Sequence, residues 1–220
     1  MKLEILYEDN HVIVAVKPPM LPVQADSSGD IDMLTMLKNY IKKKYEKPGE
    51  VYLGLVHRLD RPVGGVMVFA RTSKAAARLS EQVRLRQIEK EYAAVIHGTP
   101  KKEGILKDYL LRDKATNKTL VVKKGTPEAK EAVLSYRVEE SKNGLSLVKI
   151  QLETGRHHQI RVQFASRGYA LYGDVRYGNP EEKGQIALVS HRLAFIHPTK
   201  KEKMAFSIDY KKRLKVPEFF

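Results

Sequence analysis

The chain has 220 residues, and its 40 lysines and arginines against 26 aspartates and glutamates give a formal net charge of +14. Such an excess attracts polyanions, so a nucleic acid is the expected partner, and a lysine-rich soluble surface is the plain alternative. Cysteine is absent, which excludes disulfides, thiolate metal sites and a cysteine nucleophile. The chain has no long apolar run and its start is acidic, so we expect no membrane partner and a cytoplasmic location.

Strands and helices are both predicted in the first half of the chain. Strands are expected at residues 3–7, 11–16, 51–56, 65–70 and 92–96. Residues 23–31 have the composition of a loop. A helix is expected from Asp32, because apolar side chains recur there at helical spacing, and we expect Pro48-Gly49 to end it. Thr72-Ser73 is a good cap for a second helix over about 74–87.

The second half is predicted to consist mainly of hairpins. A β excursion is expected over 104–123, and residues 131–139 and 145–152 are joined by Lys142-Asn143-Gly144, a strong turn sequence. The spacing of Ile160 and Phe164 predicts a helix within 154–164. Two last strands are expected at 186–196 and 204–209. Strict βαβ alternation is missing, so the fold class is α+β with a mostly antiparallel or mixed sheet.

No motif for a nucleotide cofactor or a metal is present. The chain has neither a Walker phosphate loop nor a Gly-x-Gly-x-x-Gly run. His157 and His158 are adjacent, and His191 and His197 lie on either side of a predicted strand end. Neither spacing is typical of a metal site, so we expect no metal and no cofactor.

One candidate functional residue is Asp60, in the run His57-Arg58-Leu59-Asp60-Arg61 between two apolar segments. The plain alternative is a surface salt bridge with Arg58 or Arg61, which would contribute little. Gly64-Gly65 follows, and two glycines allow a backbone or a ligand to come close. An acid held beside cations at such a junction can stay ionised while partly dehydrated.

A second polar cluster follows the predicted hairpin, in Thr154-Gly155-Arg156-His157-His158-Gln159-Ile160-Arg161. Asp60 and Arg161 make a chemically sensible pair, because a guanidinium keeps a carboxylate deprotonated and fixes its direction. Tyr92 could offer a ring face to a flat base, and its alternative role is that of a core tyrosine.

Six ordered stretches resemble motifs of the RluA-type RNA pseudouridine synthases, over nearly the whole chain. They are residues 9–18, His57-Arg58-Leu59-Asp60, Lys90-Glu91-Tyr92, and residues 152–161, 172–178 and 190–198. One departure is Val63-Gly64-Gly65, where the family commonly has Thr-Ser-Gly.

The resemblance implies the pseudouridine synthase fold, with helices flanking a central sheet and an active-site cleft. It implies that Asp60 is catalytic, with Arg161 as its charge partner and Tyr92 as the stacking platform. We expect His57, Arg58 and Gln159 to contact the RNA, with Arg58 filling the space that a flipped base leaves.

The substrate implied is ribosomal or transfer RNA. Because the lysine–proline motif begins at the amino terminus, we expect one catalytic domain over residues 1–220, no separate amino-terminal RNA-binding domain, and a monomer. The exact role of Asp60 stays open between attack at C1′, attack at the base and removal of a sugar proton.

Two rival functions remain at the level of the sequence. The first is a non-catalytic RNA-binding or ribosome-assembly protein of the same fold, which would not need Asp60. The second is a glycoside or nucleoside hydrolase that pairs Asp60 with Asp174 or Glu153.

Overall fold

The computed structural model describes residues 3–182, 184–217 and 219. The chain divides into two compact units. Unit 1 comprises Met1–Glu89 and Ser190–Ile208, and unit 2 comprises Lys90–Val189 and Asp209–Phe220. The prediction of one catalytic domain over residues 1–220 stays a prediction, because two compact units can together form one catalytic domain.

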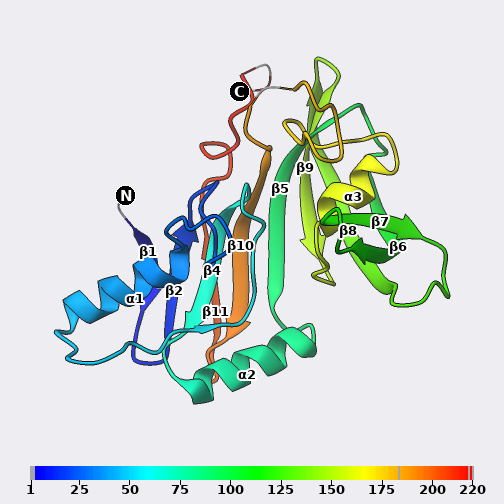
Figure 1. Ribbon diagram of the computed structural model, residues 1–220. Coiled ribbons are helices and arrows are strands. Elements are labelled where there is room, and N and C mark those ends of the chain that lie inside the picture. Colours follow the sequence, from blue (N-terminus) through cyan, green and yellow to red (C-terminus); the bar gives the residue numbers. More distant parts are fainter. Residues whose placement is uncertain (1–2, 183, 218, 220) are drawn as a thin grey trace. The chain divides into compact units, whose positions relative to one another are not determined.

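Unit 1 is built on neighbouring strands in the order β1-β2-β4-β10 (Figure 1). β11 pairs with β10, and the short β3 pairs with β4. The bounds are β1 Glu4–Glu8, β2 Val12–Lys17, β3 Gly54–Leu55, β4 Gly64–Ala70, β10 Leu188–Ile196 and β11 Lys203–Ser207. Every residue of β2 and β4 is buried, as expected for strands covered on both faces.

Two helices belong to unit 1, α1 (Met33–Lys44) and α2 (Ser73–Arg84). Asp32 caps α1 by accepting a hydrogen bond from the Thr35 amide, and Thr72 caps α2 in the same way through the Ala75 amide. The apolar face of α2 packs on the sheet, in a core with members from β2, β4 and β10. Both predicted helix starts are thereby confirmed to within one residue.

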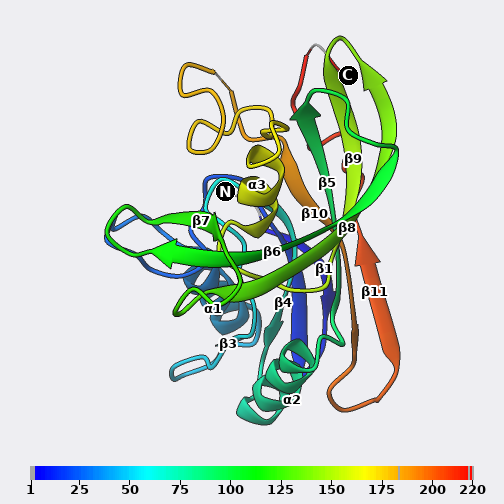
Figure 2. The same cartoon turned by 90° about the vertical axis from the view of Figure 1, so that its right-hand side faces the viewer.

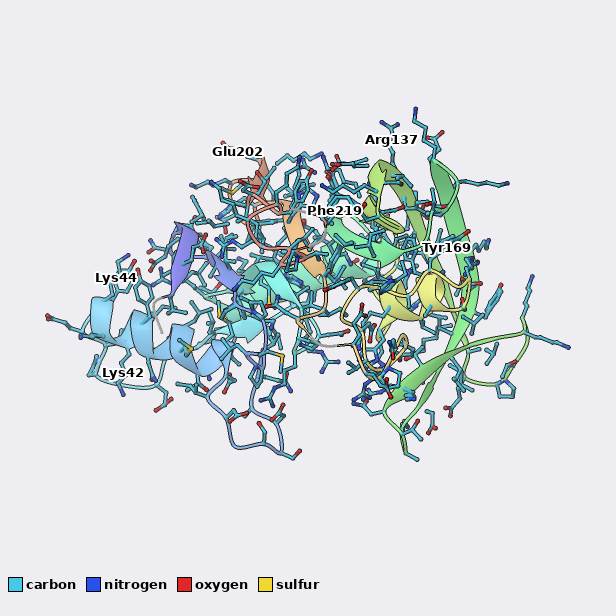
Figure 3. The ribbon with its side chains drawn as sticks, turned by 90° about the horizontal axis from the view of Figure 1, so that it is seen from above. Lys42, Lys44, Arg137, Tyr169, Glu202 and Phe219 are labelled. Atoms are coloured by element: carbon cyan, nitrogen blue, oxygen red, sulfur yellow. The ribbon has the colours of Figure 1, made fainter. Side chains whose placement is uncertain are left out.

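Three predictions in unit 1 need correction, and the first is that α2 ends at Arg84 and not near residue 87. α1 ends at Lys44, before Pro48, because Glu46 takes a left-handed φ of 48° and the Lys47 amide bonds back to the Lys42 carbonyl at 3.0 Å. Figure 3 labels Lys42 and Lys44 in this last turn. The strand predicted over 51–56 is reduced to Gly54–Leu55. Val51 and Leu53 are buried although they belong to no strand, so their apolar side chains indicate burial and not strand pairing.

Unit 2 contains a second run of neighbouring strands, in the order β5-β9-β8-β6-β7, and each neighbouring pair is antiparallel. The bounds are β5 Glu89–His97, β6 Glu103–Asp113, β7 Lys118–Val122, β8 Lys130–Lys142 and β9 Leu145–Leu152. The predicted β8–β9 hairpin is confirmed, and its turn residues Asn143 and Gly144 both have positive φ, as a type I′ turn requires.

The third helix, α3 (Gln159–Ala165), packs against β6 and β7 (Figure 2). It is shorter than the prediction over 154–164, because residues 154–158 form a loop. His158 precedes the helix with a left-handed φ of 50°, which the helical pattern could not reveal. In the part of the chain that the structure describes, no helix is both long and apolar enough to cross a membrane.

Candidate active site

The Asp60 loop in unit 1 is held from behind by Lys17. Lys17 is the last residue of β2, and its side chain is fully buried. Its ammonium donates hydrogen bonds to the main-chain carbonyls of Leu21 at 2.7 Å, Arg61 at 2.9 Å and Pro18 at 3.1 Å. One buried cation therefore joins the proline-rich segment after β2 to the loop that carries Asp60.

Asp60 is also the electrostatic partner of Lys17. Burial lowers the pKa of Lys17 to about 7, and the negative charge of Asp60 acts in the opposite direction. A buried ammonium is costly unless it is hydrogen-bonded and compensated by charge. Three hydrogen bonds are present, and the charge of Asp60 offsets only part of the effect of burial and of the nearby positive charge of Arg61. The Asp60 carboxylate in turn has the Lys17 side chain near it, which carries a positive charge below a pH of about 7. The sequence led us to expect an arginine in that role.

The turn after Asp60 is closed by local bonds. The Val63 amide donates to the Asp60 carbonyl at 3.0 Å. Arg61 forms ion pairs with Asp30 and, at 3.7 Å, with Asp26, which both lie in the loop predicted over 23–31. Arg61 therefore links the loop that carries Asp60 to the loop predicted over 23–31 through two acidic partners.

His57 and Arg58 differ in their surroundings. The Nε2 atom of His57 accepts a 3.1 Å hydrogen bond from the Val68 amide in β4, which fixes the ring against the sheet. Arg58 is exposed. The RNA contacts predicted for both residues stay predictions, and the exposed guanidinium of Arg58 fits that role more directly than the half-buried ring of His57.

The glycines after Asp60 allow a close approach of backbones. A Cβ on Gly65, whose φ is +137°, would lie 2.3 Å from the Ser190 carbonyl oxygen and 2.6 Å from its amide nitrogen. Any side chain at Gly65 would thus push the start of β4 away from β10. The prediction that Gly64-Gly65 allows a close approach is confirmed for the backbone of Ser190 next to Gly65.

Arg161 in unit 2 is bound by Asp174. Its Nε and Nη2 atoms donate to the two carboxylate oxygens of Asp174, both at 2.8 Å. The side chains are 6% and 0% exposed, so this is a buried bidentate ion pair. Asp174 also accepts from the Arg176 and Tyr177 amides. With both oxygens occupied, Asp174 is poorly suited to be the second carboxylate of a hydrolase.

A layer of aromatic side chains covers this ion pair. The Arg161 guanidinium lies over the Tyr177 ring, 5.2 Å from its centre, and the Tyr177 hydroxyl is 2.8 Å from Nδ1 of His158. His157 stacks on His158 and is 2.8 Å from the Thr119 hydroxyl of β7. Burial, with the positive charge of Arg161 next, lowers the pKa of His158 to about 2, so this ring is neutral.

Two further predicted residues in unit 2 are buried. Tyr92 in β5 is 6% exposed and Gln159 is 3% exposed. The Gln159 side chain accepts from the Thr154 hydroxyl and the Arg156 amide and donates to the Val133 carbonyl. These three bonds shape the loop before α3, and the RNA contact predicted for Gln159 would compete with them.

The structure brings Lys17 and Asp60 together within unit 1, and Arg161, Asp174 and Tyr177 within unit 2. The pairing of Asp60 with Arg161 and the stacking role of Tyr92 stay predictions. Sequence reasoning did not assign Lys17 to the site, and it named Asp174 only as a candidate hydrolase carboxylate. A lysine ending an otherwise apolar strand and an aspartate after Gly173 were the available clues. Among the described residues, no group of three histidines, aspartates or glutamates could hold a metal ion.

Comparison with known proteins identifies the family of the chain. The RNA pseudouridylate synthase family profile matches residues 11–166. The chain is 37% identical to the uncharacterized RNA pseudouridine synthase YjbO of Bacillus subtilis, covering 93% of this chain and 71% of that protein. It is 32% identical to the ribosomal large subunit pseudouridine synthase D of Zymomonas mobilis, covering 94% and 69%.

A solved structure shares the fold. The human RNA pseudouridylate synthase domain containing 4 superposes with a TM-score of 0.79 over 97% of this chain and 94% of its own, at 24% identity. This likeness confirms the α+β pseudouridine synthase fold predicted from the sequence. The family match and the relatives together show that the chain belongs to the RluA-type RNA pseudouridine synthases, which are isomerases that act on RNA.

Proposed function

We propose that this enzyme converts specific uridines of ribosomal RNA to pseudouridine, with Asp60 as the essential carboxylate. Two relatives that support the substrate class are named ribosomal large subunit pseudouridine synthases, C from Buchnera aphidicola and D from Zymomonas mobilis. Transfer RNA is the second candidate substrate. The net charge of +14 suits either polyanion.

The reaction is balanced without any external reagent. The N1–C1′ bond of the uridine breaks, the base turns, and a new bond forms between C5 and C1′. The proton that leaves C5 is matched by the proton that N1 gains, so no redox step is needed. A single ionised carboxylate can serve by attack at C1′, by attack at the base, or by removal of a sugar proton.

The observation that carries the proposal is the bond network behind Asp60. Lys17 fixes the adjacent Arg61 carbonyl and places a positive charge near the Asp60 carboxylate. A surface carboxylate of no function would not need a buried cation to hold its loop. Rigid support of this kind is what a catalytic group requires, because small displacements of a reacting atom reduce rates strongly.

The remaining roles follow the family resemblance. Arg161 is the charge partner of the catalytic carboxylate, and Tyr92 is the surface on which the target base stacks after leaving its helix or loop. Arg161→Ala is expected to lower turnover. Arg58 supports the RNA where the flipped base was, which suits its exposure. RNA is favoured because unstacked loop bases are accessible to such recognition.

The test is turnover of Asp60→Asn on transcribed ribosomal and transfer RNAs, with chemical mapping of pseudouridine. The variant should fold, bind RNA with wild-type affinity and form no pseudouridine. Asp209→Asn is the matched control, since Asp209 is an exposed partner of Lys212. Substantial turnover by the Asp60 variant would remove that residue from its role.

The same experiment separates the enzyme from a non-catalytic RNA-binding protein. A binding protein would leave transcribed RNA unmodified even as the wild type. Pseudouridine maps of total RNA from cells with and without the protein then identify the modified position. If the protein is the enzyme, at least one pseudouridine should be missing from cells that lack it, and the Asp60→Asn variant should not restore that pseudouridine.

A further inference from the structure

Lys90 is a half-buried cation in unit 2. It lies near the start of β5, and its ammonium is close to the loop before α3. A Cβ added to the exposed Gly155 would be 3.2 Å from the Lys90 Nζ atom. Among the described residues, no carboxylate forms an ion pair or hydrogen bond with Lys90.

Arg156 places a second cation next to the first. Its Nε atom donates to the Glu131 carbonyl at 2.9 Å, and its amide donates to Gln159 at 3.0 Å, so both ends of the residue are anchored. The carboxylate of Glu131 is 3.0 Å from the Lys107 ammonium. For the Nη atoms of Arg156, the described part of the chain provides no hydrogen-bond acceptor.

Two neighbouring cations are unfavourable in this setting. Burial lowers the pKa of Lys90, and the positive charge of Arg156 lowers it further. Like charges that are partly removed from water destabilise a fold unless an anion compensates them. The protein nevertheless holds Arg156 in place through two hydrogen bonds. This combination is typical of a site that is completed by an anionic ligand.

The position in β5 indicates what that anion is. Side chains alternate along a strand, so Lys90 and Tyr92 are on the same face of β5. We infer that Lys90 and Arg156 together bind one phosphate group of the RNA backbone, next to the nucleotide that Tyr92 receives. This rests on the proposed function, in which RNA is the substrate and Tyr92 the stacking surface.

The salt dependence of RNA binding tests the site. Each phosphate contact contributes about 0.7 to 0.9 to the slope of log affinity against log salt. Lys90→Met should lower the magnitude of that slope by about this amount. The ratio of wild-type to variant affinity should therefore be roughly five- to eightfold larger at 0.1 M salt than at 1 M salt. The RNA is a transcribed large-subunit ribosomal RNA. Lys101→Met, at an exposed lysine of the same unit, is the matched control and should change the slope less.

A second variant tests whether the two cations share one phosphate. Arg156→Gln alone should lower the slope by a similar amount, and the double variant should lower it no further, because a single phosphate is lost in each case. Additive losses would mean two separate contacts and would overturn the shared site. An unchanged slope in both single variants would overturn it as well.

Thermal unfolding supplies a readout that does not depend on catalysis. Lys90→Met should unfold at the same temperature as wild type or higher, because it removes an uncompensated charge. Inorganic phosphate, at constant ionic strength, should stabilise wild type and not the variant. A purely structural lysine predicts the reverse: the variant is less stable and phosphate has no differential effect.

These outcomes separate the two proposals. If Asp60→Asn is inactive but Lys90→Met keeps the full salt slope, the phosphate site is wrong and the proposed function stands. If wild type modifies no RNA, the proposed function fails. The phosphate effect on unfolding then still decides whether Lys90 and Arg156 bind an anion.

Discussion

The ammonium of Lys17 donates a 2.9 Å hydrogen bond to the main-chain carbonyl of Arg61, the residue directly after Asp60. The two residues are 44 positions apart in the sequence, and the lysine side chain is completely buried. The bond fixes the loop from inside the protein. Lys17 is thus expected to act as a positioning residue for the loop in which we propose the catalytic carboxylate.

Replacing Lys17 by methionine tests this role. Lys17→Met would remove the donor from three main-chain carbonyls. The bond to the Leu21 carbonyl is fully buried, and an unsatisfied buried group costs about 1–3 kcal/mol. We expect a lower free energy of unfolding in urea and a reduced turnover number. Lys42→Met, at an exposed lysine in the last turn of α1, should change neither. Wild-type turnover by Lys17→Met would show that the loop does not depend on this lysine.

The stability of the protein should depend on pH through Lys17. Its pKa in the folded state is about 7, below the ordinary value of 10.5 that applies to the unfolded chain. Between these values the unfolded state binds more protons, so the Lys17 contribution to stability rises with pH. Below pH 7 both states carry the proton and the contribution is constant.

The measurement is the difference in unfolding free energy between wild type and Lys17→Met, followed from pH 6 to pH 9. We expect the difference to shift in favour of wild type above pH 7 by at most about 1.4 kcal/mol per pH unit. A difference that is independent of pH would show that Lys17 keeps its ordinary pKa.

Loss of the Arg161–Asp174 ion pair should be strongly destabilising. Asp174→Asn removes the buried negative charge that binds both the Nε and the Nη2 atom of Arg161, and breaking a buried ion pair typically costs about 3–5 kcal/mol. Urea unfolding gives the change, with Asp209→Asn at an exposed pair as the control. A loss below about 1 kcal/mol would mean that water or another group replaces the carboxylate.

His158 should make the protein sensitive to acid. Its pKa in the folded state is about 2, against 6.5 in the unfolded chain, so the unfolded state binds an extra proton between these values. Stability is therefore fully present above pH 6.5 and falls as the pH is lowered. Because part of the ring is accessible, we expect less than the maximum of about 1.4 kcal/mol per pH unit.

His158→Asn is a suitable comparison, because asparagine tolerates the left-handed φ of 50° at this position. The variant should lose less stability than wild type between pH 6.5 and pH 5 in urea unfolding. Equal losses in both proteins would assign the acid sensitivity to other groups.

Most of the strands and the starts of the two longer helices could be predicted because they depend on local patterns. The turn at Asn143-Gly144 and the helix caps Asp32 and Thr72 are examples, since each acts on residues next to it. The errors have the opposite origin. Val51 and Leu53 are buried and Tyr52 between them is exposed, and such a pattern does not by itself tell a paired strand from unpaired backbone.

The sequence by itself determined the charge, the order of the motifs and the identity of Asp60 as the candidate carboxylate, because these depend only on residue type and spacing. The tertiary structure decided which groups hold that chemistry in place. Lys17 under the Asp60 loop and Asp174 on Arg161 are contacts across 44 and 13 positions. Contacts of this kind form only when packing brings distant segments together, so no local pattern could have specified them.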